Sequence, residues 1–145
     1  RSSAPSVEEP LTRTPISSSL TSSREAFGSA GATFCVAQKN RPGSEYRATF
    51  ENAIHMVDLL RWYCGGKAVE VTAHAAGDDP WEEDGTAAVI RFDSGNTGVL
   101  MAARTAGAWN EKLDAYGAGR SAEVCAPESV SITDTVPKPS PASTR

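Results

Sequence analysis

The sequence has 145 residues, of which 39% are hydrophobic and 22% charged, with a net charge of −4 and a pI near 5.2. This size and composition suit one globular domain with irregular ends. The lysines and arginines form no basic stripe, which argues against nucleic acid as a partner. No apolar run approaches the roughly 20 residues that a membrane helix needs. We therefore expect a cytoplasmic protein with no nucleic-acid or membrane partner.

The three cysteines, Cys35, Cys64 and Cys125, are far apart in the sequence and form no CxxC pair. An odd count without such a pair indicates neither a zinc knuckle nor a disulfide framework. We predict three buried or half-buried thiols in a reducing cytosol.

Composition divides the chain into three parts. Residues 1–24 are rich in Ser, Thr and Pro and are predicted to be a flexible segment, and residues 134–145 a disordered tail. The packed domain is then expected over residues 25–133, which is long enough for a modest core.

The first predicted elements are a strand over residues 31–39, a Pro-Gly loop over 40–46 and a helix over about 48–63. The helix is amphipathic and ends before Gly65 and Gly66, which are typical of helix termini. Its predicted buried stripe must face a sheet or another helix, and consists of Phe50, Ile54, Val57, Leu59 and Leu60.

The remaining elements are all predicted strands, over residues 69–77, 86–92, 97–105, 110–119, 120–126 and 128–134. The turn DSGN joins the second and third of these in a hairpin. One long helix covers only one face of such a sheet, so we predict an α+β fold: a mainly antiparallel open sheet with a helix packed on one face. The hairpin carries apolar residues on both faces, which favours association through the second face.

Glu51, His55 and Asp58 are spaced four and three residues apart, which places them on one side of the predicted helix. An imidazole beside a carboxylate can serve as a general acid or base. Two other interpretations remain open: His55 is a structural residue paired with Asp58, or the three side chains bind iron or manganese. Asp58 can equally pair with Arg61.

Four stretches, in order, resemble the C-terminal domain of the glucose–fructose oxidoreductase / inositol dehydrogenase (Gfo/Idh/MocA) family: FGSAGATFCVAQKNRPG, ENAIHMVDLLRWYCGGKAVEVTAH, DGTAAVIRFDSGNTGVLMAA and NEKLDAYGAGRSAEV. The HxxDLLRW motif followed by glycine is the most specific part, and the resemblance covers residues 27–126.

The resemblance implies an NAD(P)-dependent oxidoreductase that acts on a sugar, inositol or similar polyol. It implies that His55 is the catalytic acid/base, that Glu51 stands at the family's aspartate position, and that Asp58 is a candidate orienting group. It also points, weakly, to Asn40 and Arg41 as substrate contacts, and to a homo-oligomer formed through the open sheet.

The family's nucleotide-binding elements are missing from this sequence. No GxGxxG follows a strand, and the family's Glu-Lys-Pro segment is absent, so the Rossmann domain is expected to lie outside this chain. The chain alone should then bind no dinucleotide and have little activity, whereas the complete enzyme would use NAD or NADP. The alternatives are a non-catalytic assembly module, orphaned or degenerate, and an unrelated metal-binding α+β protein.

Overall fold

The computed structural model describes residues 16–43, 45, 47–49, 53–79, 82–126 and 129–134. Within these residues the elements follow in the order α1 (Ile16–Glu25), β1 (Phe34–Asn40), α2 (Ile54–Cys64), β2 (Ala68–Ala76), β3 (Gly85–Phe92), β4 (Thr97–Ala103), β5 (Asn110–Gly117), β6 (Arg120–Ala126) and β7 (Ser129–Asp134).

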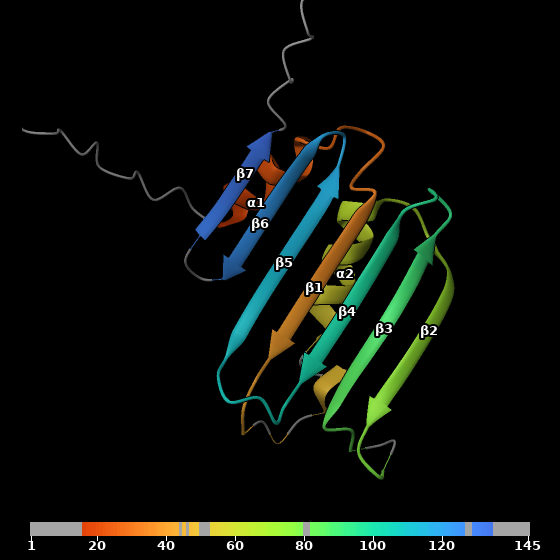
Figure 1. The fold of residues 1–145 in the computed structure, drawn as a ribbon, viewed down its shortest axis with the longest axis vertical. Coiled ribbons are helices and arrows are strands. Elements are labelled where there is room, and N and C mark those ends of the chain that lie inside the picture. Colours follow the sequence, from red (N-terminus) through yellow and green to blue (C-terminus); the bar gives the residue numbers. More distant parts are fainter. Residues whose placement is uncertain are drawn as a thin grey trace, which may run out of the picture.

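The seven strands form one sheet in the order β2-β3-β4-β1-β5-β6-β7 (Figure 1). Neighbouring strands are antiparallel except β1 and β4, which is the parallel pair of the described sheet. A parallel pair needs a long crossover, and α2 lies within that crossover. The predicted mainly antiparallel α+β sheet is confirmed.

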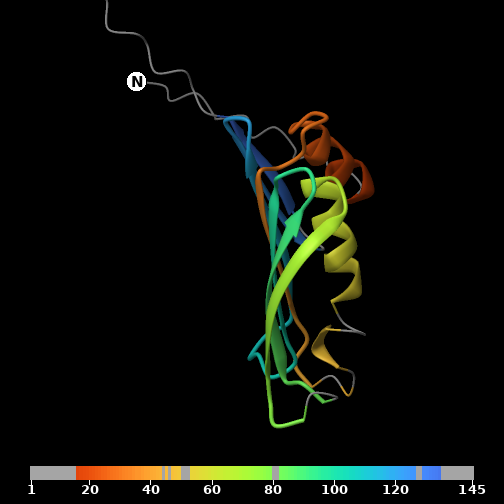
Figure 2. The same ribbon diagram turned by 90° about the vertical axis from the view of Figure 1, so that its right-hand side faces the viewer.

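Both helices lie on the same face of the sheet, so the domain has two layers (Figure 2). Helix α2 packs against β1 and β4, while α1 lies behind β6 and β7. Alternate strand residues point at the helices and form the core with α2. The largest buried core side chains include Tyr63, Leu60, Leu113, Cys35 and Cys64.

Helix α1 was not predicted, because residues 16–24 read as part of a flexible segment. The helix is stabilised by packing rather than by composition. Leu20 packs against the core, and the hydroxyls of Ser23 and Tyr63 hydrogen-bond to each other at a site that solvent does not reach. A small serine at this position lets the helix approach α2 closely.

Helix α2 begins at Ile54; residues 48–49, where the predicted helix starts, are in a π-helical turn, and residues 50–52 are outside the described residues. Its buried residues are Met56, Leu60, Tyr63 and Cys64, with Val57 and Leu59 partly buried. Ile54, predicted to lie in the buried stripe, is instead 50% exposed. Ile54 precedes the buried Met56 by two residues, which is a rotation of about 200° around the helix axis. The Ile54 side chain therefore points away from the sheet. Phe50, the other residue at the start of that stripe, is outside the described residues.

The C-terminus of α2 is held by the turn between β3 and β4. Asn96 Nδ2 donates hydrogen bonds to the carbonyl of Cys64 at 2.6 Å and to that of Ala30 at 2.8 Å. Ser94 Oγ also lies 3.0 Å from the Cys64 carbonyl oxygen. Carbonyls at a helix end have no partner within the helix, so this turn satisfies groups that would otherwise need solvent. The DSGN sequence thus forms the predicted hairpin and caps a helix as well.

The loop before β1 completes this junction. The backbone N–H of Ala32 donates to the carbonyl of Tyr63 at 2.7 Å. Gly31 has a φ of +75°, and a Cβ at this position would lie 2.6 Å from the same Tyr63 oxygen. Only glycine allows the loop to pass so close to the helix.

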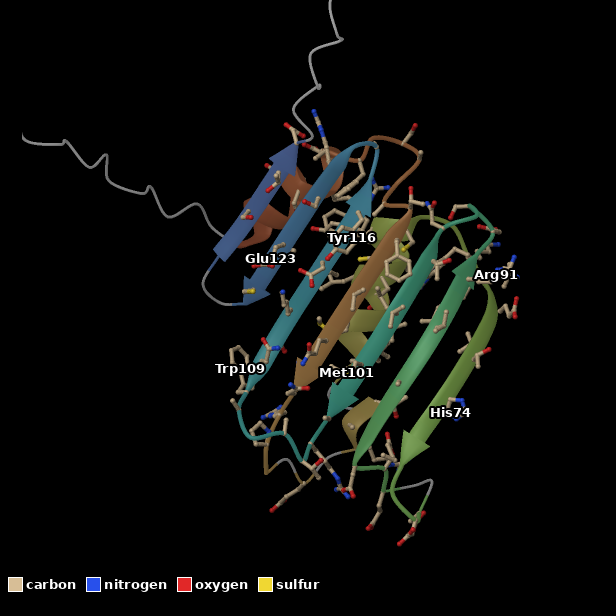
Figure 3. The ribbon with its side chains drawn as sticks, viewed as in Figure 1. His74, Arg91, Met101, Trp109, Tyr116 and Glu123 are labelled. Carbon is tan, nitrogen blue, oxygen red and sulfur yellow. The ribbon has the colours of Figure 1, made fainter. Side chains whose placement is uncertain are left out.

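The sheet face away from both helices, which we call the open face, has no covering element in the described part of the chain (Figure 2). Its side chains include Met101 and Tyr116, which are 42% and 45% exposed and point toward the viewer in Figure 3. Ile90 and Phe92 are buried on the other face, against the helices. The hairpin of β3 and β4 thus carries apolar side chains on both faces of the sheet, as predicted.

Candidate functional site

His55 is the second residue of α2 and is exposed. It lies on the outer side of the helix, away from the sheet, because the inner side carries Met56 and Leu60. The N-cap residue is Ala53, whose side chain makes no capping hydrogen bond, and residues 50–52 before it are outside the described part of the chain. The imidazole therefore stands at an uncapped helix N-terminus, where the backbone N–H groups favour negative charge.

Asp58 and Arg61 continue the same outer side of α2. Asp58 Oδ1 lies 3.9 Å from Arg61 Nη1, and both side chains are largely exposed. A pair of this kind, three residues apart on a helix surface, contributes little to stability. Asp58 thus has Arg61 as its ionic partner. We call Ile54, His55, Asp58, Arg61 and Trp62 the outer stripe of α2; all five are exposed.

Glu51, the carboxylate predicted to assist His55, lies outside the described residues. The structure therefore does not place it, and its predicted role stays a prediction.

The C-terminal end of β1 lies on the same side of the domain as the start of α2. Tyr63, near the end of α2, hydrogen-bonds to Ala32 just before β1. The helix therefore runs back along β1, and its N-terminus lies toward Lys39 and Asn40 at the end of that strand (Figure 1).

Lys39 and Asn40 point to opposite faces of the sheet. Lys39 lies on the helix-covered face with Cys35 and Ala37, is 6% exposed, and forms an ion pair with Glu111 of β5. The two residues are directly opposite each other in the antiparallel register of β1 and β5. A buried ammonium needs such a partner, since an unpaired charge is costly away from water.

Asn40 lies opposite Asn110 in the register of β1 and β5. Its side-chain oxygen Oδ1 is buried and has no hydrogen-bond partner among the described residues. Arg41 follows it; its backbone N–H donates to Ala103 at 2.9 Å and its side chain is exposed. The alternation of the strand puts Asn40 on the side away from Lys39. Asn40 and Arg41 thus lie at the C-terminal end of β1, and Asn40 does not share the face on which α2 packs; their predicted contact with substrate stays a prediction.

Glu111 could not be found as the partner of Lys39 from sequence alone. The pairing depends on the register of two strands separated by a helix and three other strands. One signal in the sequence could have suggested it. If residues 39–40 (KN) and 110–111 (NE) are aligned antiparallel, the lysine lies opposite the glutamate and the two asparagines lie opposite each other.

Two general searches of the described residues add limits. No helix among them is long and apolar enough to cross a membrane. No group of three or more His, Cys, Asp or Glu side chains is arranged there to hold a metal ion. Since Glu51 is not described, this leaves the iron or manganese interpretation of the Glu51–His55–Asp58 pattern untested.

Comparison with known families decides the ancestry of this arrangement. A family model described as the GFO/IDH/MocA C-terminal domain matches residues 25–123. The chain belongs to this family. The resemblance recognised in the sequence is therefore confirmed, and with it the identification of the α+β domain as a Gfo/Idh/MocA C-terminal domain.

Solved structures share the fold of this Gfo/Idh/MocA domain. UDP-N-acetylglucosamine 3-dehydrogenase GnnA from Acidithiobacillus ferrooxidans aligns with a TM-score of 0.71 at 19% identity, over 79% of this chain and 39% of that one. The WlbA dehydrogenase from Bordetella pertussis, in complex with NADH and UDP-GlcNAcA, aligns with a TM-score of 0.64 at 18% identity, over 86% and 43%.

Levoglucosan dehydrogenase in complex with NADH aligns with a TM-score of 0.66 at 16% identity, over 79% of this chain and 38% of that one. At these identities the likeness establishes the fold. The chain spans about two fifths of the length of these structures. No curated protein matches the sequence.

Proposed function

We propose that this domain binds the substrate of an NAD(P)-dependent oxidoreductase that oxidises a hydroxyl of a sugar, inositol or similar polyol. Family membership and the position of His55 support the proposal together. His55 is exposed at the start of α2, on a side of the helix that no described element covers. A titratable side chain displayed in this way is available to a substrate, whereas a structural histidine is usually packed or hydrogen-bonded.

In this proposal His55 handles the proton of the reacting hydroxyl. Its neutral imidazole accepts the proton during oxidation and returns it in the reverse direction, as a general base and acid do. The uncapped N-terminus of α2 assists, because its N–H groups favour the negative charge that develops on the oxygen. Glu51 would hold the imidazole in the required orientation. Asp58 is engaged by Arg61, so its proposed orienting role is secondary.

At the end of β1, Asn40 and Arg41 are proposed to contact the sugar hydroxyls. The buried Asn40 oxygen without a partner supports this, since such an atom is costly unless a ligand or water satisfies it. The buried pair of Lys39 and Glu111 would then support the strand end from the opposite face.

The cofactor does not fit the described part of this chain. NAD or NADP would accept the hydride, but its phosphates need a strand–glycine loop–helix unit such as GxGxxG, and the described residues contain no such unit. We therefore propose that a nucleotide-binding domain outside this chain holds the dinucleotide. It would face the outer stripe of α2, which carries the exposed Ile54 and Trp62.

The first test uses the protein expressed with its full reading frame. NAD(P)H formation is followed with nucleotide sugars, anhydrosugars and inositols as substrates. His55→Ala should reduce kcat by about a hundredfold or more, the usual scale for losing a general acid or base. The matched control is His74→Ala, which removes the other histidine, exposed on β2. Equal kcat in the wild type and His55→Ala would contradict the proposal.

The alternative proposal is a non-catalytic assembly or binding module without a nucleotide-binding half. Its support is the open face, which no described element covers. The coding sequence upstream of Arg1 distinguishes the two proposals. A strand followed by GxGxxG, and later Glu-Lys-Pro, would favour the enzyme; unrelated sequence or a stop codon would favour the module.

We also propose that a second copy of the chain covers the open face, giving a homo-oligomer. The face has an apolar centre, with Val89, Met101 and Phe34 each more than 40% exposed. Charged pairs flank it on both sides: Arg91 with Glu70 at 2.5 Å, and Lys112 with Glu123 at 3.0 Å. A patch with an apolar centre and charged rim is typical of protein interfaces, and a two-fold axis would make it self-complementary.

Sedimentation velocity over a range of concentrations tests this assembly. Met101→Lys should shift the protein toward monomer, because it buries a charge at the centre of the interface. Ser29→Lys adds the same charge on an exposed loop and should leave the assembly unchanged. A wild type that is monomeric at every concentration would refute the homo-oligomer.

The free state of all three cysteines supports a further proposal, that the protein works in the reducing cytoplasm.

A further inference from the structure

Two of the three cysteines meet in the core, although 29 positions separate them in the sequence. Cys35 lies on the helix-facing side of β1 and Cys64 is the last residue of α2, and both are 0% exposed. The two side chains are near enough for each to shift the pKa of the other. Cys125, on β6, is partly exposed. The proposed dehydrogenase chemistry uses none of these thiols.

The surroundings fix where the Cys64 thiol lies. Cys64 Sγ is 3.5 Å from the carbonyl oxygen of Thr97, the first residue of β4. In the parallel register of β1 and β4, Thr97 lies opposite Phe34, and Gly98 lies opposite Cys35. Because Gly98 has no side chain, α2 approaches β4 closely here: a Cβ on Gly98 would lie 3.2 Å from Leu60 Cδ2, one turn before Cys64.

The backbone around this pair is also fixed. Asn96 and Ser94 hold the Cys64 carbonyl, and Ala32, three residues before Cys35, holds the carbonyl of Tyr63. The two buried thiols are thus on neighbouring segments that backbone hydrogen bonds hold together, and proximity of this kind is the first requirement for a disulfide.

We propose that Cys35 and Cys64 are a redox-active dithiol that hydrogen peroxide converts to an intramolecular disulfide, which joins β1 to α2. The reduced pair is the state described above. The site is a modification site independent of the proposed catalytic function, because His55 lies at the opposite end of α2.

The chemistry balances with peroxide as the two-electron oxidant. The Cys64 sulfur attacks one peroxide oxygen, the O–O bond breaks, and a sulfenic acid and one water form. The Cys35 sulfur then attacks the Cys64 sulfur, the S–O bond breaks, and a disulfide and a second water form. Two thiols lose two electrons and two protons, and one peroxide becomes two waters.

Cys64 is the attacking residue in this sequence. The neighbouring Cys35 side chain lowers the pKa of the Cys64 thiol, against the effect of burial, and the Arg24 guanidinium lowers it further. The neighbouring Cys64 side chain, together with burial, raises the pKa of the Cys35 thiol. The more acidic thiol reacts first and the other resolves the intermediate. Burial favours a small oxidant such as peroxide and hinders bulky disulfide reagents.

Peptide mapping tests the proposal directly. Trypsin places the three cysteines in different peptides, residues 25–39, 62–67 and 121–145. The purified folded protein is treated with peroxide, its remaining thiols are alkylated, and it is digested without reductant. We expect a linked pair of peptides 25–39 and 62–67 that separates on reduction. The bulky reagent dithiobis(nitrobenzoate) should react only with Cys125 in the folded protein.

Thermal unfolding provides a second readout. A disulfide that closes the loop from residue 35 to residue 64 should raise the unfolding midpoint by on the order of 10 °C relative to the reduced protein. Cys125→Ser should keep this shift, and Cys64→Ser should lose it. The mapping result stands without the variants if Cys64→Ser fails to fold.

Three results would overturn the proposal. One is the absence of the linked peptides at a peroxide concentration that oxidises Cys125. Another is a link that forms only in urea, which would show that the folded state does not bring the thiols together. The third is an oxidised wild type whose unfolding midpoint equals that of the reduced protein.

Discussion

The two ends of α2 differ in how they are held. At its C-terminus, the carbonyls of Tyr63 and Cys64 accept hydrogen bonds from Ala32 and Asn96. At its N-terminus, Ala53 offers no side-chain cap, and Ile54 and His55 are exposed. One end is thus built into the core, and the other displays the side chains of Ile54 and His55. A helix anchored in this way can present His55 in a fixed position without further support at the N-terminus.

The largest expected difference between the two ends comes from Leu60 and Ile54. Leu60 is fully buried, so Leu60→Ala should reduce the free energy of unfolding by about 2–5 kcal/mol. Ile54 is 50% exposed, and Ile54→Ala should cost less than about 1 kcal/mol. Urea unfolding of both variants measures this. Similar losses would mean that a further element covers the outer stripe.

A second prediction tests the anchor at the C-terminus. Asn96→Ala removes the donor to two carbonyls and should cost about 1–3 kcal/mol of unfolding free energy. Asn96→Asp should cost more, although its side chain has the same shape. A carboxylate cannot donate, and its charge is repelled by the carbonyls at the helix C-terminus. If Asn96→Asp were the milder change, shape rather than hydrogen bonding would explain the anchor.

The third prediction concerns pH and the Tyr63 hydroxyl. Burial raises the pKa of Tyr63, and the hydrogen bond with Ser23 offsets part of that rise. A raised folded-state pKa means that the fold favours the protonated form. The stabilisation is complete below the unfolded pKa of about 10 and is lost as pH rises through the folded pKa.

Tyr63→Phe measures this effect, since it cannot titrate. Near pH 8 it should be less stable than the wild type by about 1 kcal/mol, through loss of the hydrogen bond with Ser23. Above pH 10 the wild type should lose stability faster than Tyr63→Phe, so the gap should close. Parallel curves from pH 8 to pH 11 would show that Tyr63 ionises as readily in the folded protein as in the unfolded chain.

Much of the sheet was predictable, because its signals are local. Alternating β-branched residues located all seven strands to within a few residues, and DSGN located the hairpin between β3 and β4. The predicted helix over about 48–63 includes α2 and the π-helical turn at residues 48–49, but it did not show that Ile54 is exposed. Helix α1 was missed, because a serine-rich segment gains its stability from α2 and the sheet.

The candidate site was predictable only where it depends on one segment. His55 was found from its spacing with Glu51 and Asp58, and from the HxxDLLRW motif. The pairing of Lys39 with Glu111 and the capping of α2 by Asn96 join segments distant in sequence. Such contacts depend on strand order and register, which local patterns do not specify. The proximity of Cys35 and Cys64 likewise depends on the strand register, which local patterns do not specify.

The smallest predicted effect has the opposite sign and concerns the uncapped end. Ala53→Ser places a hydroxyl where it can accept a hydrogen bond from a backbone N–H in the first turn of α2. It should raise the free energy of unfolding by about 0.5–1 kcal/mol, as measured in urea. Ala53→Val is the control, since it adds volume without an acceptor at this fully buried position. A loss of stability with both variants would mean that packing around Ala53, rather than ligand access, explains the missing cap. A gain with serine alone would show that the N-terminus of α2 can accept a cap that its sequence does not provide, as expected of a helix end kept free for a ligand.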